Sequence, residues 1–421
     1  VTAKGKPGEL DAEINATVAD HNRAAREVIE KQGITINDLY ALMLGKLNLA
    51  RGDRFHWTPA GQAVQASAVV AAVRAASPGS HVSQPATGRP NILLILADDM
   101  GYGDVHALNP ERGKIPTPNL DRLADQSMVF TDAHSGSSVC TPTRYGVQTG
   151  RYAWRTHLQK GILQPTSPAL IAADRLTLPG MLKAQGYRTA GFGKWHLGQD
   201  APLTNGNFAL DQSFLNDPST RGYDYHFGSD LRFFAPFMFV ENGRFIGTPL
   251  FNRTQPGAKH GAGTPLKPDD FSHILPTVCD RAIAKLKEFS ANPQPFFVYL
   301  APCAPHDPFV PTDAWKGKSG LSVYADYVME TDAEFGRVLT ALDQTGLATN
   351  TLVFFASDNG CAPYTGVKGM EEKGHYPSAD KRGYKSDIWD GGHHVPFMAR
   401  WPGKIRAGAT NSQAICLTDF M

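Results

Sequence analysis

The sequence predicts an α/β protein built on a large mixed, mostly parallel β-sheet flanked by helices. Three apolar runs predict this class: Asn91–Ala97, Pro295–Ala301 and Thr351–Ser357. Unbroken apolar runs of strand length are typical of central strands that are buried on both faces. Thr177–Gln185 has a helical composition, and a shorter strand is expected after it at Arg188–Gly191.

Two of these strands end in oxygen-bearing side chains. Asp98 and Asp99 follow the first run, and Asp358 and Asn359 follow the third. Ligands of open α/β sheets bind beyond the carboxyl ends of the strands. Two adjacent carboxylates repel each other unless a cation neutralises them, and a hard divalent ion is the usual partner. Helix capping would explain one carboxylate, and Asp-Asn-Gly alone is a common turn. No His or Cys cluster has the sequence spacing of a zinc site.

Cys140 begins the stretch Cys140-Thr-Pro-Thr-Arg144, which lies among serine and threonine residues. A lone cysteine is usually a buried, inert thiol, but these polar neighbours do not resemble a core. Pro142 is expected in the first turn of a helix, so that Arg144 can fold back toward position 140. The pattern therefore favours a functional cysteine with an arginine beside it.

Cationic side chains occur in three further segments. They are Gly191-Phe-Gly-Lys194-Trp-His196-Leu-Gly198, Pro302-Cys-Ala-Pro-His306-Asp-Pro308, and Arg382-Gly-Tyr-Lys385 with the following Asp390-Gly-Gly-His-His394-Val-Pro396. A lysine and a histidine two positions apart on an extended segment point the same way, here toward a shared anion. A single histidine after a strand is more often structural. The segment with His306 therefore indicates a functional site only in combination with the other two segments.

These blocks occur in the order found in the formylglycine-dependent sulfatases, and Cys-x-Pro-x-Arg resembles their signature. The resemblance covers about Arg89 to Met421 and implies an alkaline-phosphatase-like fold. The sequence departs from the family pattern at Asp390, where glutamate is usual, and at His394, where arginine is usual. The arginine is expected to be structural, so the exchange at His394 affects local packing or substrate contacts more than the chemistry.

The resemblance implies a sulfuric ester hydrolase in which a maturation enzyme converts Cys140 to Cα-formylglycine. One hydroxyl of its hydrate would attack sulfur, and the second would expel sulfate. The resemblance also implies one calcium ion, held by Asp98, Asp99, Asp358, Asn359 and the residue at position 140. Arg144 and Lys194 would orient the hydrate, and His196 would take a proton in the elimination step. Lys385 and His306 would bind the sulfate and assist the leaving oxygen.

The N-terminal part does not resemble a sulfatase. Ala12–Lys31 is expected to be a helix, residues 34–40 a strand and turn, and a second helix extends to about Ala76. Asp53 and His56, in Asp-x-x-His-x-Thr-x-x-Gly, resemble the last block of the SGNH (GDSL-type) hydrolases. We therefore expect residues 1–76 to be the remnant of an SGNH α/β domain, 77–89 a linker, and 90–421 a sulfatase domain. The chain is expected to be a fragment that lacks a small C-terminal subdomain.

Composition excludes some classes of partner. Lys and Arg number 41 against 40 Asp and Glu, which argues against nucleic-acid binding by bulk charge. No apolar run has membrane-spanning length.

Cys303 and Cys361 both lie beside site segments and are candidates to approach each other, whereas the pairing of Cys279 and Cys416 stays open. For the full-length protein we expect a periplasmic or secreted location.

The substrate is expected to be a sulfated carbohydrate. Residues 200–267 are rich in Gly, Asn, Phe and Tyr, and aromatic side chains such as Tyr225, with Arg232, could line a sugar subsite. The same aromatics could instead pack beneath a long loop. Two alternatives to the sulfatase hypothesis stay open: a phosphonate or phosphate monoester hydrolase of the same superfamily, and an unmodified, inactive glycan-binding protein.

Overall fold

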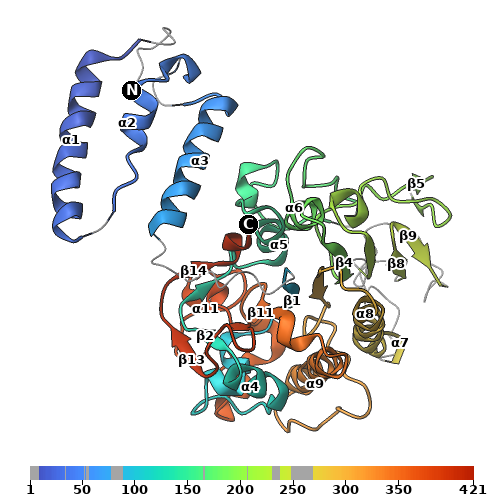
Figure 1. The fold of residues 1–421 in the computed structure, drawn as a ribbon. Helices are drawn as coiled ribbons and strands as arrows, with labels where there is room; N and C mark the ends of the chain where they lie inside the picture. Colours follow the sequence, from blue (N-terminus) through green and yellow to red (C-terminus); the bar gives the residue numbers. More distant parts are fainter. Residues whose placement is uncertain are drawn as a thin grey trace. The chain divides into compact units, whose positions relative to one another are not determined.

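The computed structural model describes residues 9–33, 35–51, 53, 56–76, 89–164, 166–205, 207–229, 238–247 and 269–421. The chain divides into two compact units, Val1–Gly88 and Arg89–Met421 (Figure 1). In the described ranges, no helix is long and apolar enough to cross a membrane.

The first unit is helical where it is described. It contains α1 (Ala12–Lys31), α2 (Leu39–Leu44) and α3 (Pro59–Ala76). The strand expected over residues 34–40 is wrong. Asp38 caps α2 instead, because its Oδ1 accepts a 2.8 Å hydrogen bond from the backbone N–H of Ala41; residue 34 itself lies outside the described residues.

Asp53 and His56 are in contact in this unit. The His56 backbone N–H donates to Asp53 Oδ1 at 2.7 Å, and His56 Nδ1 lies 3.0 Å from Asp53 Oδ2. A short Asp-to-His turn makes these contacts in many proteins, so the kinship with SGNH hydrolases stays a prediction.

The second unit is organised around one large sheet. Its strand order is β13-β2-β12-β11-β1-β10-β4-β7-β8-β9. The strands are β1 (Asn91–Ala97), β2 (Met128–Phe130), β4 (Arg188–Gly193), β7 (Tyr225–Gly228), β8 (Phe239–Glu241), β9 (Arg244–Ile246), β10 (Phe296–Ala301), β11 (Thr351–Ser357), β12 (Phe397–Arg400) and β13 (Ala409–Asn411). Short strands pair outside it: β3 (Ala133–His134) with β14 (Ile415–Cys416), and β5 (Leu203–Thr204) with β6 (Asn207–Phe208).

Parallel pairing dominates the middle of the sheet. The strands β11, β1, β10, β4 and β7 run parallel to one another, whereas β12 pairs antiparallel with β11 and β8 pairs antiparallel with β7. In register, Leu94 of β1 pairs with Tyr299 on one side and Phe354 on the other. The predicted fold class, a mixed and mostly parallel sheet flanked by helices, is confirmed.

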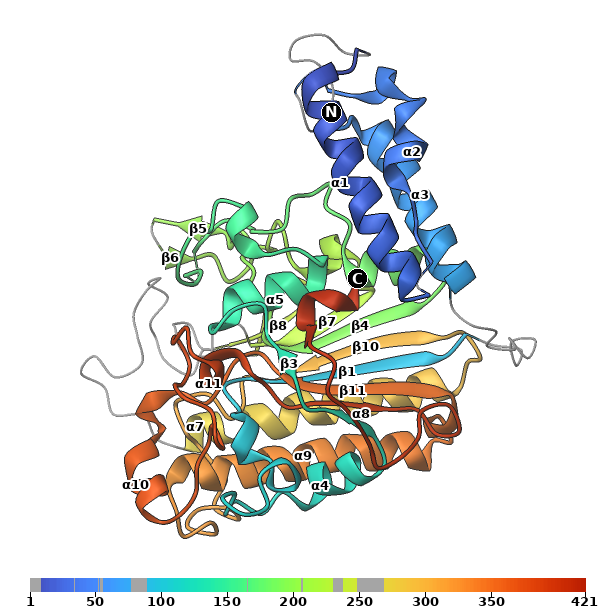
Figure 2. The same cartoon turned by 90° about the vertical axis from the view of Figure 1, so that its left-hand side faces the viewer.

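Helices cover both faces of this sheet. The α-helices are α4 (Pro118–Asp125), α5 (Cys140–Thr149), α6 (Leu178–Ala184), α7 (Asp269–Ser272), α8 (Ile274–Ser290), α9 (Val323–Gln344), α10 (Val367–Glu372) and α11 (Asp390–His393). Figure 2 shows α8 and α9 on one side of the central strands and α5 on the other. Single 3₁₀ turns lie at Leu47–Leu49 in the first unit and, in the second, at Tyr102–Asp104, His106–Leu108, Ala153–Arg155, Pro218–Arg221, Ala348–Asn350, Pro363–Thr365 and Leu417–Phe420.

The β1 side chains alternate between the two cores. Leu93 and Ile95 belong to the apolar cluster that includes residues of α8 and α9, and Leu94 and Leu96 belong to the cluster with α5 and α6. This alternation follows from the two-residue period of a strand. Truncating Ile95 to alanine would cost about 2–5 kcal/mol of stability, because its side chain is fully buried.

Backbone hydrogen bonds join the segments at the carboxyl ends of the central strands. The backbone N–H of Asp98, after β1, donates to Ala304 O, that of Asp358 to Ala97 O, and that of Lys194 to Ala301 O. Gly193 ends β4 with φ 99°, and a Cβ there would lie 2.1 Å from Ala301 O. Only glycine allows this approach, which brings the segment after β4 against the segment after β10.

Candidate active site

The predicted metal ligands meet at this edge of the sheet. Asp98 and Asp99 follow β1, Asp358 and Asn359 follow β11, and all four are buried. The backbone N–H of Asp99 donates to Asp358 Oδ1 at 3.2 Å, and Asn359 Nδ2 donates to Asp99 Oδ1 at 2.7 Å. Asp99 has φ 66°, a left-handed conformation that aspartate tolerates better than most residues. The sequence therefore places these oxygen donors together from strands 260 residues apart.

Cys140 is the first residue of α5 and is buried, and Arg144 follows one turn later. The Arg144 guanidinium contacts Asp358 through Nε at 3.0 Å and Nη2 at 2.8 Å, while Nη1 donates to the backbone O of Lys194 at 3.0 Å. Arg144 thus joins α5, β11 and β4 at the site. Burial would lower its pKa, but Asp358, Tyr299, Asp98 and Cys140 together raise the pKa of Arg144.

Two lysines approach the carboxylates from different segments. Lys194 Nζ donates to Asp98 Oδ2 at 2.8 Å, and Lys385 Nζ donates to Asp99 Oδ2 at 2.6 Å. Burial alone would lower the pKa of each lysine, but Asp98 and Cys140 raise the pKa of Lys194, and Asp99 and Cys140 raise that of Lys385. Both lysines are therefore cationic and lie within electrostatic reach of Cys140.

The two predicted histidines lie in different settings. His306 Nε2 lies 3.5 Å from Asp99 Oδ2, and its Nδ1 lies 3.0 Å from Asp307 Oδ1. His196 Nε2 lies 3.1 Å from the backbone O of Leu163, whose N–H is bonded to Thr141 Oγ1 beside Cys140. The extended segment expected for Lys194 and His196 is wrong. The strand β4 ends at Gly193, and His196 adopts φ 57°.

The carboxylates differ in their ease of ionisation. Burial would raise the pKa of Asp98, but Lys194, His306, Arg144 and Lys385 hold that pKa well below its usual range. Burial and the charge of Asp98 raise the pKa of Asp358 above its usual value. The two carboxylates therefore resist being charged together in the absence of further positive charge.

Two buried oxygens of the cluster lack hydrogen-bond donors. Asp98 Oδ1 and Asn359 Oδ1 have no hydrogen-bond partner in the described part of the chain. Asp98, Asp99 and His306 also place potential ligand atoms within 4.8 Å of one another. Unsatisfied buried oxygens are costly, and a hard cation with oxygen ligands would satisfy them. The donor set thus fits a calcium ion.

Sequence reasoning missed several residues that contact Asp99 or the nearby Asp104. The Tyr324 hydroxyl donates to Asp104 Oδ2 at 2.5 Å and lies 3.0 Å from the Asp99 backbone O, and His375 Nε2 lies 2.9 Å from Asp104 Oδ1. Tyr364 also approaches the Asp99 carboxylate, because its hydroxyl lies 3.5 Å from Asp99 Oδ2. No local spacing signals such contacts, which join residues more than 200 positions apart.

Two further expectations are corrected. Cys303 and Cys361 do not form a disulfide bond; instead, Cys303 Sγ contacts Ser229 O, and Cys361 Sγ lies 3.3 Å from Thr365 Oγ1. Tyr225 packs against Phe192 and beneath the Lys285 ammonium, so it belongs to the core rather than to a sugar subsite. Arg232 and its aromatic neighbours lie outside the described residues.

The family's arginine position is filled by a neutral side chain. His394 is buried, and burial together with Lys381 and His134 lowers its pKa to about 4. His394 Nε2 lies 2.9 Å from Thr131 O and cannot supply the charge of an arginine. Asp390 is half-exposed and begins α11.

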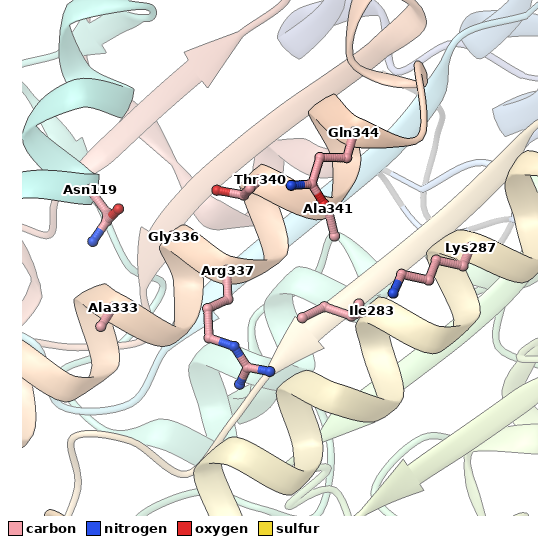
Figure 3. Close-up of a pocket in the computed structure, with 9 residues that line it drawn as sticks. All are labelled: Asn119, Ile283, Lys287, Ala333, Gly336, Arg337, Thr340, Ala341 and Gln344. Carbon is pink, nitrogen blue, oxygen red and sulfur yellow. The ribbon is translucent and has the colours of Figure 1, made fainter. Parts of the chain in front are cut away.

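A surface pocket between helices is separate from this cluster. It has a volume of about 380 Å³ and lies between α8 and α9 (Figure 3). Its lining residues are Asn119, Ile283, Lys287, Ala333, Gly336, Arg337, Thr340, Ala341 and Gln344. None of them is a predicted site residue, so the pocket is not the candidate active site.

Comparison with known proteins identifies the family. The Sulfatase family model matches residues 90–421, and the chain belongs to the sulfatase family. It is 30% identical over 361 residues to the N-acetylgalactosamine-6-O-sulfatase of Bacteroides thetaiotaomicron, covering 76% of this chain and 68% of that protein. It is 33% identical over 355 residues to arylsulfatase A of Bos taurus, covering 79% and 63%.

A solved structure shows the same fold. A Bacteroides thetaiotaomicron protein from work on the metabolism of multiple glycosaminoglycans superposes with a TM-score of 0.69 and 28% identity, covering 79% of this chain and 76% of that one. The alkaline-phosphatase-like fold of the sulfatases is therefore shown for residues 89 onward. The chain spans about two thirds of the length of the curated relatives it matches.

Proposed function

We propose that this protein hydrolyses sulfate monoesters of a carbohydrate, with formylglycine at position 140 and one calcium ion. The observation that carries the proposal is the position of Cys140. It begins α5, is buried, and lies within electrostatic reach of Arg144, Lys194 and Lys385. A sulfate ester carries anionic oxygens that such fixed cations stabilise in the transition state.

The calcium ion would be held by Asp98, Asp99, Asp358 and Asn359 with the residue at position 140. Formylglycine would supply the hydrate nucleophile, and the ion would supply positive charge beside it. Arg144 keeps Asp358 in place through two contacts and fixes the Lys194 backbone through a third. The positions of Asp358 and of the Lys194 backbone therefore depend on Arg144.

The remaining cations would bind the sulfate and serve the leaving group. Lys194 approaches from the segment after β4 and Lys385 from the loop before α11, so together they can hold an anion from two directions. His306 would hold a proton on Nε2 for the leaving oxygen. Burial would lower its pKa, but Asp99 and Asp98 raise the pKa of His306 above its ordinary value, which favours the protonated ring. His196 would accept a proton in the elimination step.

A sulfated carbohydrate is supported as the substrate by the names of the relatives. The bacterial relative is named as a sulfatase of N-acetylgalactosamine 6-O-sulfate. In this chain, Tyr364 is more than half exposed and lies beside Asp99 and Asp307, where its ring can contact a sugar. The maturation enzyme that makes formylglycine would be an obligatory partner.

The test is turnover of matched esters by protein produced with a formylglycine-generating enzyme. We expect sulfate release from a sulfated N-acetylhexosamine and from an aryl sulfate, and a much slower reaction with the aryl phosphate or phosphonate. Cys140→Ala should remove turnover and retain substrate binding. Faster turnover of phosphate or phosphonate esters would instead favour the phosphomonoester alternative. Binding of the sulfated sugar without turnover, by protein that keeps Cys140 unmodified in the presence of the maturation enzyme, would favour the glycan-binding alternative.

A further inference from the structure

Two histidines outside the catalytic cluster face each other through the same ring nitrogen. His134 ends β3 and His393 ends α11, and their Nδ1 atoms lie 3.0 Å apart. The opposite nitrogen of each ring is held by an oxygen. His134 Nε2 lies 2.7 Å from Asp132 Oδ1, and His393 Nε2 lies 3.2 Å from the backbone O of Ile388.

The hydrogen-bond partners fix the tautomers of both rings. A backbone carbonyl or carboxylate oxygen can only accept, so each Nε2 must carry the ring hydrogen. A neutral imidazole has one N–H, and both Nδ1 atoms therefore present lone pairs to each other. Two lone pairs at this distance repel unless a cation, either a proton or a metal ion, lies between them.

Further donors surround this pair. Asp390, His134 and His393 have potential ligand atoms within 4.8 Å of one another. His394 repeats the same pattern, because its Nε2 lies 2.9 Å from Thr131 O and its Nδ1 is 3.9 Å from Asp390 Oδ2. His394 is only 5% exposed, and its Nδ1 has no hydrogen-bond partner among the described residues.

We propose that His134, His393 and Asp390 form a second metal site for a borderline divalent ion of the zinc class. Imidazole nitrogens with one carboxylate suit zinc, copper or nickel and do not suit calcium. Metal-bound histidines usually donate their other N–H to a carboxylate or a backbone carbonyl, as Asp132 and Ile388 accept here. The half-exposed Asp390 side chain leaves room for water or an exchangeable ligand.

This site joins two segments that adjoin the catalytic cluster. The Ser135 N–H donates to His393 O at 2.8 Å, on the path from β3 to Cys140. On the other side, the Gly360 N–H, directly after Asn359, donates to Gly392 O at 3.0 Å. A metal ion here would crosslink α11 and β3. It would thereby stabilise the segment that leads to Cys140 and the segment that follows Asn359. It shares no ligand with the proposed calcium site, so the two sites can be tested separately.

The experiment is a titration of the full chain, saturated with Ca²⁺, with Co²⁺ as an optical probe and Zn²⁺ as the competitor. We expect a single equivalent of Co²⁺ to bind with a visible absorption band that Zn²⁺ abolishes. His134→Gln and His393→Gln should each weaken binding by at least about tenfold, and Asp132→Asn by about tenfold. Zn²⁺ should raise the thermal unfolding midpoint of the wild type and not that of His393→Gln.

Two control variants locate the bound ion. Cys140→Ala removes the thiol at the proposed nucleophile position, and His157→Gln removes an exposed histidine of the same unit; both should bind Co²⁺ as the wild type does. If the histidine variants do not fold, Asp390→Asn, at a half-exposed side chain, supplies the test. The proposal is overturned if Ca²⁺-saturated wild type binds no Co²⁺, if Cys140→Ala loses the signal, or if the ligand variants retain wild-type affinity.

Discussion

Lys385 Nζ donates a 2.6 Å hydrogen bond to Asp99 Oδ2, although the two residues lie 286 positions apart. The contact joins a proposed sulfate-binding cation to a proposed calcium ligand. Lys194 and Asp98 form the same kind of pair at 2.8 Å. A divalent ion among the carboxylates would compete for the same oxygens, so metal binding would release lysine donors toward the substrate.

Lys385→Ala should lower kcat/KM for a sulfate ester by about 10²–10³, because it removes one fixed donor to the developing charge. The measurement is steady-state turnover of an aryl sulfate at saturating calcium. Lys368→Ala, at an exposed lysine, is the matched control and should leave turnover unchanged. Wild-type turnover by Lys385→Ala would exclude Lys385 from the sulfate site.

Asp358→Asn should abolish high-affinity calcium binding and activity while the protein stays folded. Asparagine keeps an oxygen acceptor for Arg144, whereas alanine would leave a buried guanidinium without its partner and cost about 3–5 kcal/mol. Calorimetric titration of chelator-treated protein measures the binding. The exposed Asp313→Asn serves as the control. Full activity of chelator-treated wild type would rule out the metal requirement.

Tyr324→Phe should weaken calcium binding without removing any ligand. The hydroxyl supports the Asp99 backbone O and Asp104 Oδ2, and the loss of buried hydrogen bonds costs about 1–3 kcal/mol. Urea unfolding gives the loss of stability, and calcium titration gives the change in affinity. Unchanged calcium affinity in a destabilised variant would limit Tyr324 to a purely structural role.

The strands that carry the site could be predicted because each is a continuous apolar run. The structure has β1, β10 and β11 within one residue of the predicted bounds. The antiparallel strands β8 and β9 could not be predicted, since three-residue strands have no periodicity to detect. The error at α2 arose because Ile34-Thr-Ile alternates like a strand, whereas the side-chain cap of Asp38 determines the helix start.

The site was predictable in its members and less so in its contacts. The motifs that carry Cys140, Lys194 and Lys385 are local, so they could be recognised one by one. The bonds of Asp104 to Tyr324 and His375 join residues 220 and 271 positions apart, and nothing near Asp104 indicates them. The left-handed backbone of His196 depends on the loop that follows β4 and not on the strand pattern.

His226 should make the protein less stable in mild acid. Burial lowers the pKa of His226 to about 3, whereas the unfolded chain has the ordinary value of 6.5. Between these two values the unfolded state binds more protons, so the free energy of unfolding falls as the pH falls. This single group contributes about 2 kcal/mol of loss between pH 6.5 and pH 5.

Urea unfolding of wild type and His226→Gln at pH 7 and pH 5 measures this effect. The pH-dependent loss should shrink by about 2 kcal/mol in the variant. His157→Gln, at an exposed histidine, should keep the wild-type dependence. An identical pH dependence in wild type and His226→Gln would show that His226 can be protonated in the folded protein.

The central claim is tested most directly by the mass of the tryptic peptide Leu123–Arg144, in which Cys140 is the only cysteine. Protein is produced with and without a formylglycine-generating enzyme, and sulfate release is measured on the same samples. We predict a lighter peptide, by the difference between a thiol-bearing CH₂SH group and an aldehyde, in proportion to sulfatase activity. Full sulfatase activity in a sample whose peptide retains the unmodified Cys140 mass would contradict the account.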